Sequence, residues 1–109
     1  MKTVETLEID AYVIDTLMQD LVGHDHQPSA FLVYLFLWRA TEGGRSPSEP
    51  VSLRSLAEGT GLSKRAVQEA VNRLERRRLV VVHRDHPLAV PRYEVLHPWR
   101  RWQSGQDPG

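Results

Sequence analysis

Apolar residues in the first part of the chain recur at intervals of three and four, which is the period of an amphipathic helix. We expect this helix over residues 9–22, with Asp10 as its cap and Gly23 as its stop. The pattern predicts that one side of the helix packs on the rest of the domain. The apolar positions are Ile9, Tyr12, Val13, Ile14, Leu17, Met18 and Leu21.

A second helix is expected over residues 29–41, after a polar segment that contains glycine and proline. Residues 31–38 within it are all apolar or aromatic, so nearly every face of this helix is apolar. A small monomeric domain would leave part of such a surface uncovered. We therefore expect the first two helices to pack on each other and to form the interface of a homodimer.

Two short helical patterns meet across a glycine-centred turn within residues 52–77. Ser52 and Ser63 each stand just before one pattern, where a hydroxyl can accept a backbone N–H of the first turn. Gly61 lies between the patterns and supplies the positive φ that a tight turn demands. In the second pattern, apolar residues fall on one side and polar, mostly cationic residues on the other. This order is typical of a helix-turn-helix.

Strand patterns follow and predict a β-hairpin over residues 79–96. Its first strand is a largely β-branched run, and its second strand alternates between polar and apolar residues. A proline-bearing loop joins the two strands. Upstream, residues 42–50 are rich in glycine, proline and serine, which predicts a hinge or surface loop between the second helix and the helix-turn-helix.

The length of 109 residues fits one domain, which we place at residues 1–97, followed by a flexible tail over residues 98–109. In the tail we expect one of Trp99 and Trp102 to pack on the core and the arginines between them to be solvated. No cysteine is present, which excludes disulfides and thiolate metal sites. The first ten residues lack the pattern of a secretory signal, and no apolar run approaches the roughly 20 residues of a membrane span. We expect a cytoplasmic protein.

The formal net charge is zero, but charge is divided unevenly along the chain. Residues 1–50 contain three basic and eight acidic residues, a balance of −5, whereas residues 51–109 contain eleven basic and six acidic residues, a balance of +5. The basic half contains the helix-turn-helix. We therefore expect this half to meet a polyanion.

The order helix, turn, helix, strand, loop, strand resembles the winged helix-turn-helix of bacterial transcription regulators such as the MarR, GntR and PadR groups. The resemblance covers roughly residues 29–96, and Arg78 departs from it, since the family often has glycine before the first wing strand. The implied fold is α+β and mostly helical, with a three-helix core, a β-hairpin wing and an extra N-terminal helix. The residues that match the family pattern are Ala57, Gly61, Leu62 and Val67.

The resemblance implies that the second helix of the motif lies in the major groove of duplex DNA, while the wing reaches the backbone or the minor groove. Arginine and lysine can donate to guanine, and glutamine or asparagine can bond adenine at two atoms. The implied base readers are Lys64, Arg65, Gln68 and Asn72. Implied contacts to phosphates or from the wing are those of Arg54, Ser63, Arg73, Arg76, Arg84, His86 and Arg92.

Histidines occur in two pairs, His24 with His26 beside Asp25, and His83 with His86. Neither pair has a cysteine or a third anchored ligand, so we expect no metal site. The chain also lacks a Ser/His/Asp set, paired carboxylates in a plausible pocket and a glycine-rich phosphate loop. We therefore expect neither enzyme activity nor a cofactor.

These features predict a small transcriptional repressor that binds duplex DNA sequence-specifically. A homodimer would place its two recognition helices about 34 Å apart on an inverted repeat. Two alternatives stay open. One is a winged-helix module that binds another protein, which the neutral net charge and Glu69 on the polar face favour. The other is a DNA-binding factor of replication or plasmid maintenance.

Overall fold

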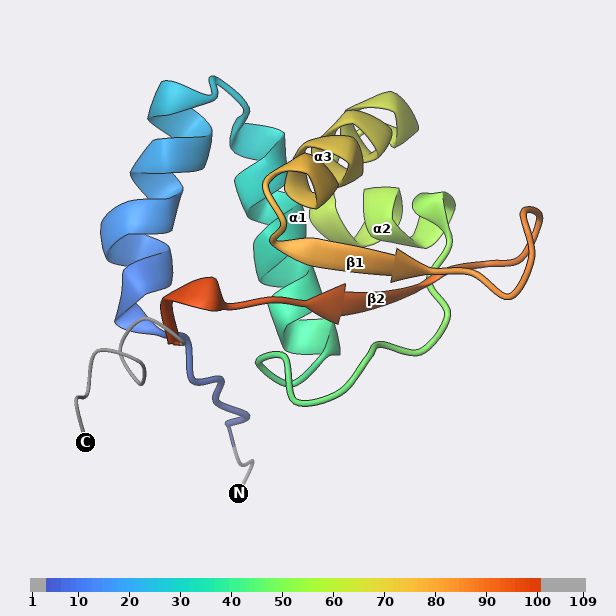
Figure 1. The fold of residues 1–109 in the computed structure, drawn as a ribbon, viewed down its shortest axis with the longest axis horizontal. Helices are drawn as coiled ribbons and strands as arrows, with labels where there is room; N and C mark the ends of the chain where they lie inside the picture. Colours follow the sequence, from blue (N-terminus) through green and yellow to red (C-terminus); the bar gives the residue numbers. More distant parts are fainter. Residues whose placement is uncertain (1–3, 101–109) are drawn as a thin grey trace.

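The computed structural model describes residues 4–100, in which helices surround a central helix and a β-hairpin follows them (Figure 1). This arrangement confirms the expected winged helix-turn-helix with an extra N-terminal helix. No helix within this part of the chain is long and apolar enough to cross a membrane. The elements are η1 (Val13–Leu17), η2 (Gln19–His24), α1 (Pro28–Ala40), α2 (Leu53–Thr60), α3 (Lys64–Arg76), β1 (Val80–His83) and β2 (Arg92–Val95).

The segments η1 and η2 are separated only by Met18, and together with residues 11 and 12 they form the N-terminal helix. Most of its turns are of the wide π type, as in the hydrogen bond from the Asp25 N–H to the Asp20 carbonyl at 2.8 Å. The expected stop at Gly23 is wrong, because η2 continues through this glycine to His24. The buried residues of the N-terminal helix are Val13, Leu17 and Leu21.

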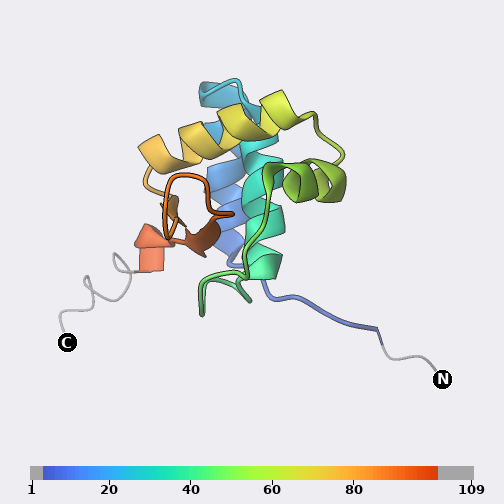
Figure 2. The ribbon, with the colours of Figure 1, turned by 90° about the vertical axis from the view of Figure 1, so that its right-hand side faces the viewer.

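The helix α1 forms the centre of the core. The N-terminal helix, α2, α3 and β2 all pack against it, and Figure 2 shows α3 crossing over its upper end. Within the apolar run of residues 31–38, only Leu32 is exposed, at 43%. The run therefore needs no second subunit to cover it, and other exposed apolar residues lie on the N-terminal helix, at Ile14, Met18 and Val22.

The loop after α1 is attached to the sheet. Ser48 is fully buried, its N–H donates to the Tyr93 carbonyl at 2.8 Å, and its hydroxyl accepts the Tyr93 N–H at 3.0 Å. The N–H of Val51 donates to the Pro91 carbonyl at 2.9 Å. The interpretation of residues 42–50 as a hinge or surface loop is therefore wrong near Ser48, where the chain pairs with β2.

The C-terminal part of the described chain packs on the core beyond the expected boundary at residue 97. Trp99 is 2% exposed, and its ring stacks on Tyr12 at 4.6 Å between centroids. The Asp10 carboxylate accepts hydrogen bonds from the Trp99 indole N–H and from the Arg100 guanidinium. Asp10 thus binds the C-terminal segment, and its side chain does not cap the first helix. Residues 101–109, which include Trp102, lie outside the described residues.

Arg78 occupies a position that favours glycine, between α3 and β1. Its φ is +58°, in the left-handed region, where a Cβ atom costs about 1–2 kcal/mol. We expect Arg78→Gly to raise the free energy of unfolding by about 0.5–1 kcal/mol, because the strain relieved exceeds the added freedom of the unfolded chain. Urea denaturation measures this gain. Arg78→Ala keeps the Cβ, so equal gains in both variants would contradict the explanation.

Candidate nucleic-acid interface

The turn between α2 and α3 has the caps that the sequence predicts. The Ser52 hydroxyl accepts the Ser55 N–H at 3.0 Å, and the Ser63 hydroxyl accepts the Ala66 N–H at 3.0 Å. Gly61 ends α2 with a φ of +79°. Both helix starts and the turn are thus stabilised locally, which fixes the direction in which α3 leaves the turn.

The helix α3 has one buried and one exposed face. Its buried side packs across α1 through Val67, Ala70, Val71 and Leu74. The four expected base readers are all exposed and lie on the opposite face, at positions one, two, five and nine of α3. The structure therefore brings together Lys64, Arg65, Gln68 and Asn72 on one open surface.

Two side-chain contacts order the exposed face of α3. The Gln68 amide donates to the Asn72 amide oxygen at 3.1 Å, and the Arg65 Nε lies 3.5 Å from a Glu69 carboxylate oxygen. Both pairs are one helical turn apart. The Arg65 partner offsets part of the negative charge of Glu69, so the acidic residue does not make this face acidic. Four cations and two carboxylates leave α3 with a balance of +2.

The expected phosphate contacts differ in how free they are. Arg54 is exposed and pairs with Glu58 at 3.2 Å, and the Ser63 hydroxyl serves α3 as its cap. Arg73 is half-buried, and its Nε donates to the Gln27 side-chain oxygen at 3.0 Å. Arg76 is exposed and has no charged or hydrogen-bonding partner among the described residues. The link between Arg73 and Gln27 spans 46 residues and has no signal in the sequence.

The arginines after α3 include a structural ion pair. Arg77 Nε donates to the Asp25 carboxylate at 2.9 Å, and His24 lies 3.0 Å from the same carboxylate. Burial opposes the charged form of Asp25, but the hydrogen bonds from His24 and Arg77 outweigh it and lower the pKa of this carboxyl group. Arg77 therefore connects the end of α3 to the turn before α1.

The wing between β1 and β2 extends away from the helices (Figure 1). The strands are antiparallel, with Val80 opposite Val95 and His83 opposite Arg92. Of the expected wing contacts, Arg84 donates to the Ala89 carbonyl at 3.2 Å and Arg92 to the Ser48 carbonyl at 3.5 Å. The residues Arg84, His86 and Arg92 are all exposed on the hairpin.

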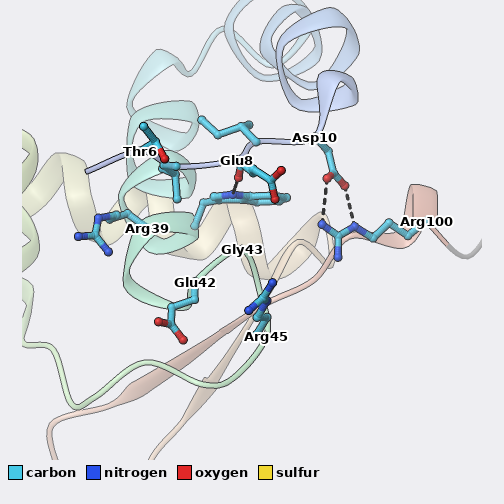
Figure 3. A pocket seen from close by; sticks show the side chains of 11 residues that line it. Thr6, Glu8, Asp10, Arg39, Glu42, Gly43, Arg45 and Arg100 are labelled. Carbon is cyan, nitrogen blue, oxygen red and sulfur yellow. Dashed lines mark hydrogen bonds and ion pairs between the residues drawn. The ribbon is translucent and has the colours of Figure 1, made fainter. Parts of the chain in front are cut away.

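Away from the exposed face of α3, a cleft of about 730 Å³ lies between residues 6–10 and the C-terminal end of α1 (Figure 3). Its floor is the Trp38 ring, whose indole N–H donates to the Glu8 carbonyl at 2.8 Å. Asp10 and Arg100 form a bidentate ion pair at its edge, with distances of 2.7 and 2.9 Å. The hydrogen bond from Arg100 lowers the pKa of Asp10 despite partial burial. The ion pair between Asp10 and Arg100 joins the two ends of the described chain.

In each histidine pair, one histidine contacts a carboxylate. His24 lies against Asp25, and His83 Nε2 lies 2.9 Å from the Glu94 carboxylate. Across residues 4–100, no three histidine or acidic side chains gather in a metal-binding geometry.

Comparison with known protein families matches residues 27–80 to a helix-turn-helix domain. The match spans α1, α2 and α3 and ends at the first residue of β1. Comparisons with curated proteins and with solved structures find no match. Residues 27–80 therefore match a helix-turn-helix domain, and the two-stranded hairpin that follows the matched helices gives this DNA-binding domain its winged form.

Proposed function

We propose that this chain binds duplex DNA sequence-specifically and regulates transcription, with repression by occlusion of a promoter as the simplest mechanism. The observation that carries the proposal is the exposed face of α3. It presents Lys64, Arg65, Gln68 and Asn72 together, on a helix held rigidly by its buried side. Such a regulator would work in the cytoplasm beside the DNA.

The chemistry of these four side chains suits the major groove. Lys64 and Arg65 can donate to guanine O6 and N7, and the paired amides of Gln68 and Asn72 can bond adenine N6 and N7. The hydrogen bond between the two amides orients them before DNA is met. Glu69 can accept from cytosine N4 when its contact with Arg65 opens.

Contacts to phosphates set the register of the protein on DNA and make binding salt-dependent. Arg54, Ser63 and Arg76 supply such contacts in the proposal, and Arg84, His86 and Arg92 supply them from the wing. All six side chains are exposed. Affinity should therefore fall steeply as salt concentration rises, because each neutralised phosphate releases counterions.

Selection of bound sequences from random duplex DNA tests this function. We expect enrichment of one motif, and repeating the measurement over a range of salt concentrations should give a steep loss of affinity. Mapping the motif in the source genome separates promoters from replication origins. Failure to retain any duplex at low salt would reject DNA binding and favour the protein-binding alternative.

We further propose that the chain acts as a homodimer through the N-terminal helix. Ile14, Met18 and Val22 are 47%, 36% and 38% exposed and are spaced four residues apart, which makes an apolar stripe along this helix. Figure 1 shows the N-terminal helix on the side of α1 away from the wing. Pairing of two such stripes would leave both α3 helices free to meet DNA.

The dimer proposal predicts the result of a double substitution. We expect Ile14→Asp/Met18→Asp to halve the mass in solution, because the pairing of two apolar stripes would then bury four carboxylates. Light scattering coupled to gel filtration measures the mass. Leu88→Asp is the matched control, since Leu88 is 91% exposed on the wing. A wild-type protein that is monomeric at high concentration would contradict this prediction.

A further inference from the structure

A small cleft of about 410 Å³ lies beside α3, on the side away from the wing. One wall is the turn of residues 25–27 between the N-terminal helix and α1, and the other is the C-terminal half of α3. Both views show α3 between this turn and the wing (Figures 1 and 2). The cleft is lined by Asp25, His26, Gln27, Glu69, Asn72, Arg73 and Arg76.

The hydrogen bond from Arg73 Nε to the Gln27 side-chain oxygen, at 3.0 Å, joins the two walls. It uses one of the five N–H groups of the guanidinium and orients the plane of this group. The other N–H groups of Arg73 have no hydrogen-bonding partner among residues 4–100. Gln27 therefore orients the guanidinium of Arg73, whose remaining N–H groups are available to donate to a ligand.

The two carboxylates of the cleft are already engaged. Asp25 has a side chain that is only 6% exposed, and it is held by Arg77 at 2.9 Å and by His24 at 3.0 Å. Glu69 lies 3.5 Å from Arg65. Arg76 is exposed without such a partner in the described part of the chain. The cleft thus has more cationic donors than acidic acceptors to satisfy them.

His26 adds a third donor in the turn. Its side chain is exposed, and its φ of +54° lies in the left-handed region that residues other than glycine rarely adopt. The imidazole ring has one N–H when neutral and two when protonated. The ring can therefore donate to an anion in either state.

We propose that this cleft binds one backbone phosphate of duplex DNA, held by Arg73, Arg76 and His26 and with Gln27 as the positioning residue. The inference rests on the proposed function and extends the DNA-binding surface to the turn before α1. With α3 in the major groove, about 12 Å wide, the wing and this turn would face the two backbones that border the groove. Guanidinium groups suit a phosphate because they donate at two atoms at once.

The test uses the full-length protein and the duplex obtained by selection. Arg76→Gln removes a cation, and Gln27→Glu keeps an oxygen acceptor for Arg73 while adding a negative charge to the cleft. We expect each variant to bind about tenfold more weakly and to lower the slope of log affinity against log salt by about 0.9. Gln27→Glu should not lower the unfolding midpoint, since glutamate strengthens the contact with Arg73 and suits the start of α1. If the cleft lay away from the DNA, Gln27→Glu would leave DNA binding unchanged.

A second arm replaces single phosphates of the duplex by neutral methylphosphonates. At one position in each bound site, we expect the wild type to lose about tenfold in affinity and Arg76→Gln to lose clearly less, since one of the three contacts to that phosphate is already gone. Arg45→Gln is the matched charge control, because Arg45 is exposed on the loop after α1, at the opposite end of this helix.

Two failures can be told apart. If the wild type retains no duplex, the proposed function itself is wrong. If the wild type binds but Arg76→Gln and Gln27→Glu match Arg45→Gln in affinity and salt slope, the phosphate site is overturned while DNA binding stands. Equal losses at every methylphosphonate in wild type and Arg76→Gln would also overturn it.

Discussion

Replacing Lys64 and Arg65 together by glutamate is expected to lower the affinity for the selected duplex at least about a hundredfold. Each side chain is proposed to donate to a base, and a good base contact discriminates by about 1–3 kcal/mol. The substitution also adds negative charge opposite the phosphates, which raises the loss further. Fluorescence anisotropy with a labelled duplex measures the change in the dissociation constant.

The fold should survive this double substitution. Both residues lie in the first turn of α3 and are exposed, and acidic side chains are favourable at a helix N-terminus. The new repulsion between positions 65 and 69 costs only about 0.5 kcal/mol. Arg39→Glu/Arg45→Glu is the matched control, with the same change in net charge far from α3. If both double variants bind equally, the exposed face of α3 is not the DNA-binding surface.

Replacing Trp99 by alanine is expected to lower the free energy of unfolding by about 3–5 kcal/mol, the usual cost of truncating a buried large aromatic residue. Trp99 is 2% exposed, stacks on Tyr12, and lies 6.4 Å from Trp38 between ring centroids. The variant also removes an N–H that the Asp10 carboxylate accepts at 2.8 Å. The cost is large relative to the 5–15 kcal/mol that stabilise a typical domain. Urea denaturation followed by far-UV circular dichroism measures it.

Two further variants separate packing from hydrogen bonding at Trp99. Trp99→Phe keeps part of the aromatic contact but loses the bond to Asp10, so we expect a smaller loss of about 1–3 kcal/mol. Leu88→Ala serves as the surface control, with a change within about 0.5 kcal/mol. If Trp99→Ala behaves like Leu88→Ala, the segment that begins at Pro98 does not contribute to the core in solution.

The helix-turn-helix could be predicted because its signals are local. The hydroxyl groups of Ser52 and Ser63 each accept a backbone N–H only three residues further along the chain. Gly61 adopts the positive φ of the turn because it has no Cβ atom. The faces of α3 follow from the helical period, which is why the exposed position of Lys64 and Arg65 needed no tertiary information. The wing was likewise predicted from β-branched and alternating residues.

Other features depend on residues far apart in the sequence and could not be predicted. Ser48 reads as part of a polar loop, yet it is buried because Tyr93 pairs with it across 45 residues. Asp10 reads as a helix cap, yet its carboxylate binds Trp99 and Arg100. In both cases a short-range pattern competes with a long-range partner that no periodicity reveals.

The apolar run of residues 31–38 shows the same division. Its composition established that this helix must be covered, since exposed apolar area is costly. Which element covers it was decided by tertiary packing, in which the N-terminal helix, α2, α3 and β2 together leave only Leu32 exposed. The apolar residues that stay exposed on the N-terminal helix are Ile14, Met18 and Val22. We propose that these residues, and not the run of residues 31–38, meet a second subunit.

The sequence by itself therefore determined the winged helix-turn-helix, its exposed cationic helix and its wing, because caps, turn glycine and hydrophobic period act over a few residues. Only the tertiary structure decided that Arg73 is oriented by Gln27, that the carboxylates near it are engaged, and that Trp99 stacks on Tyr12. These outcomes depend on which distant groups meet when the chain packs, and such meetings are set by the shape and burial of the whole domain.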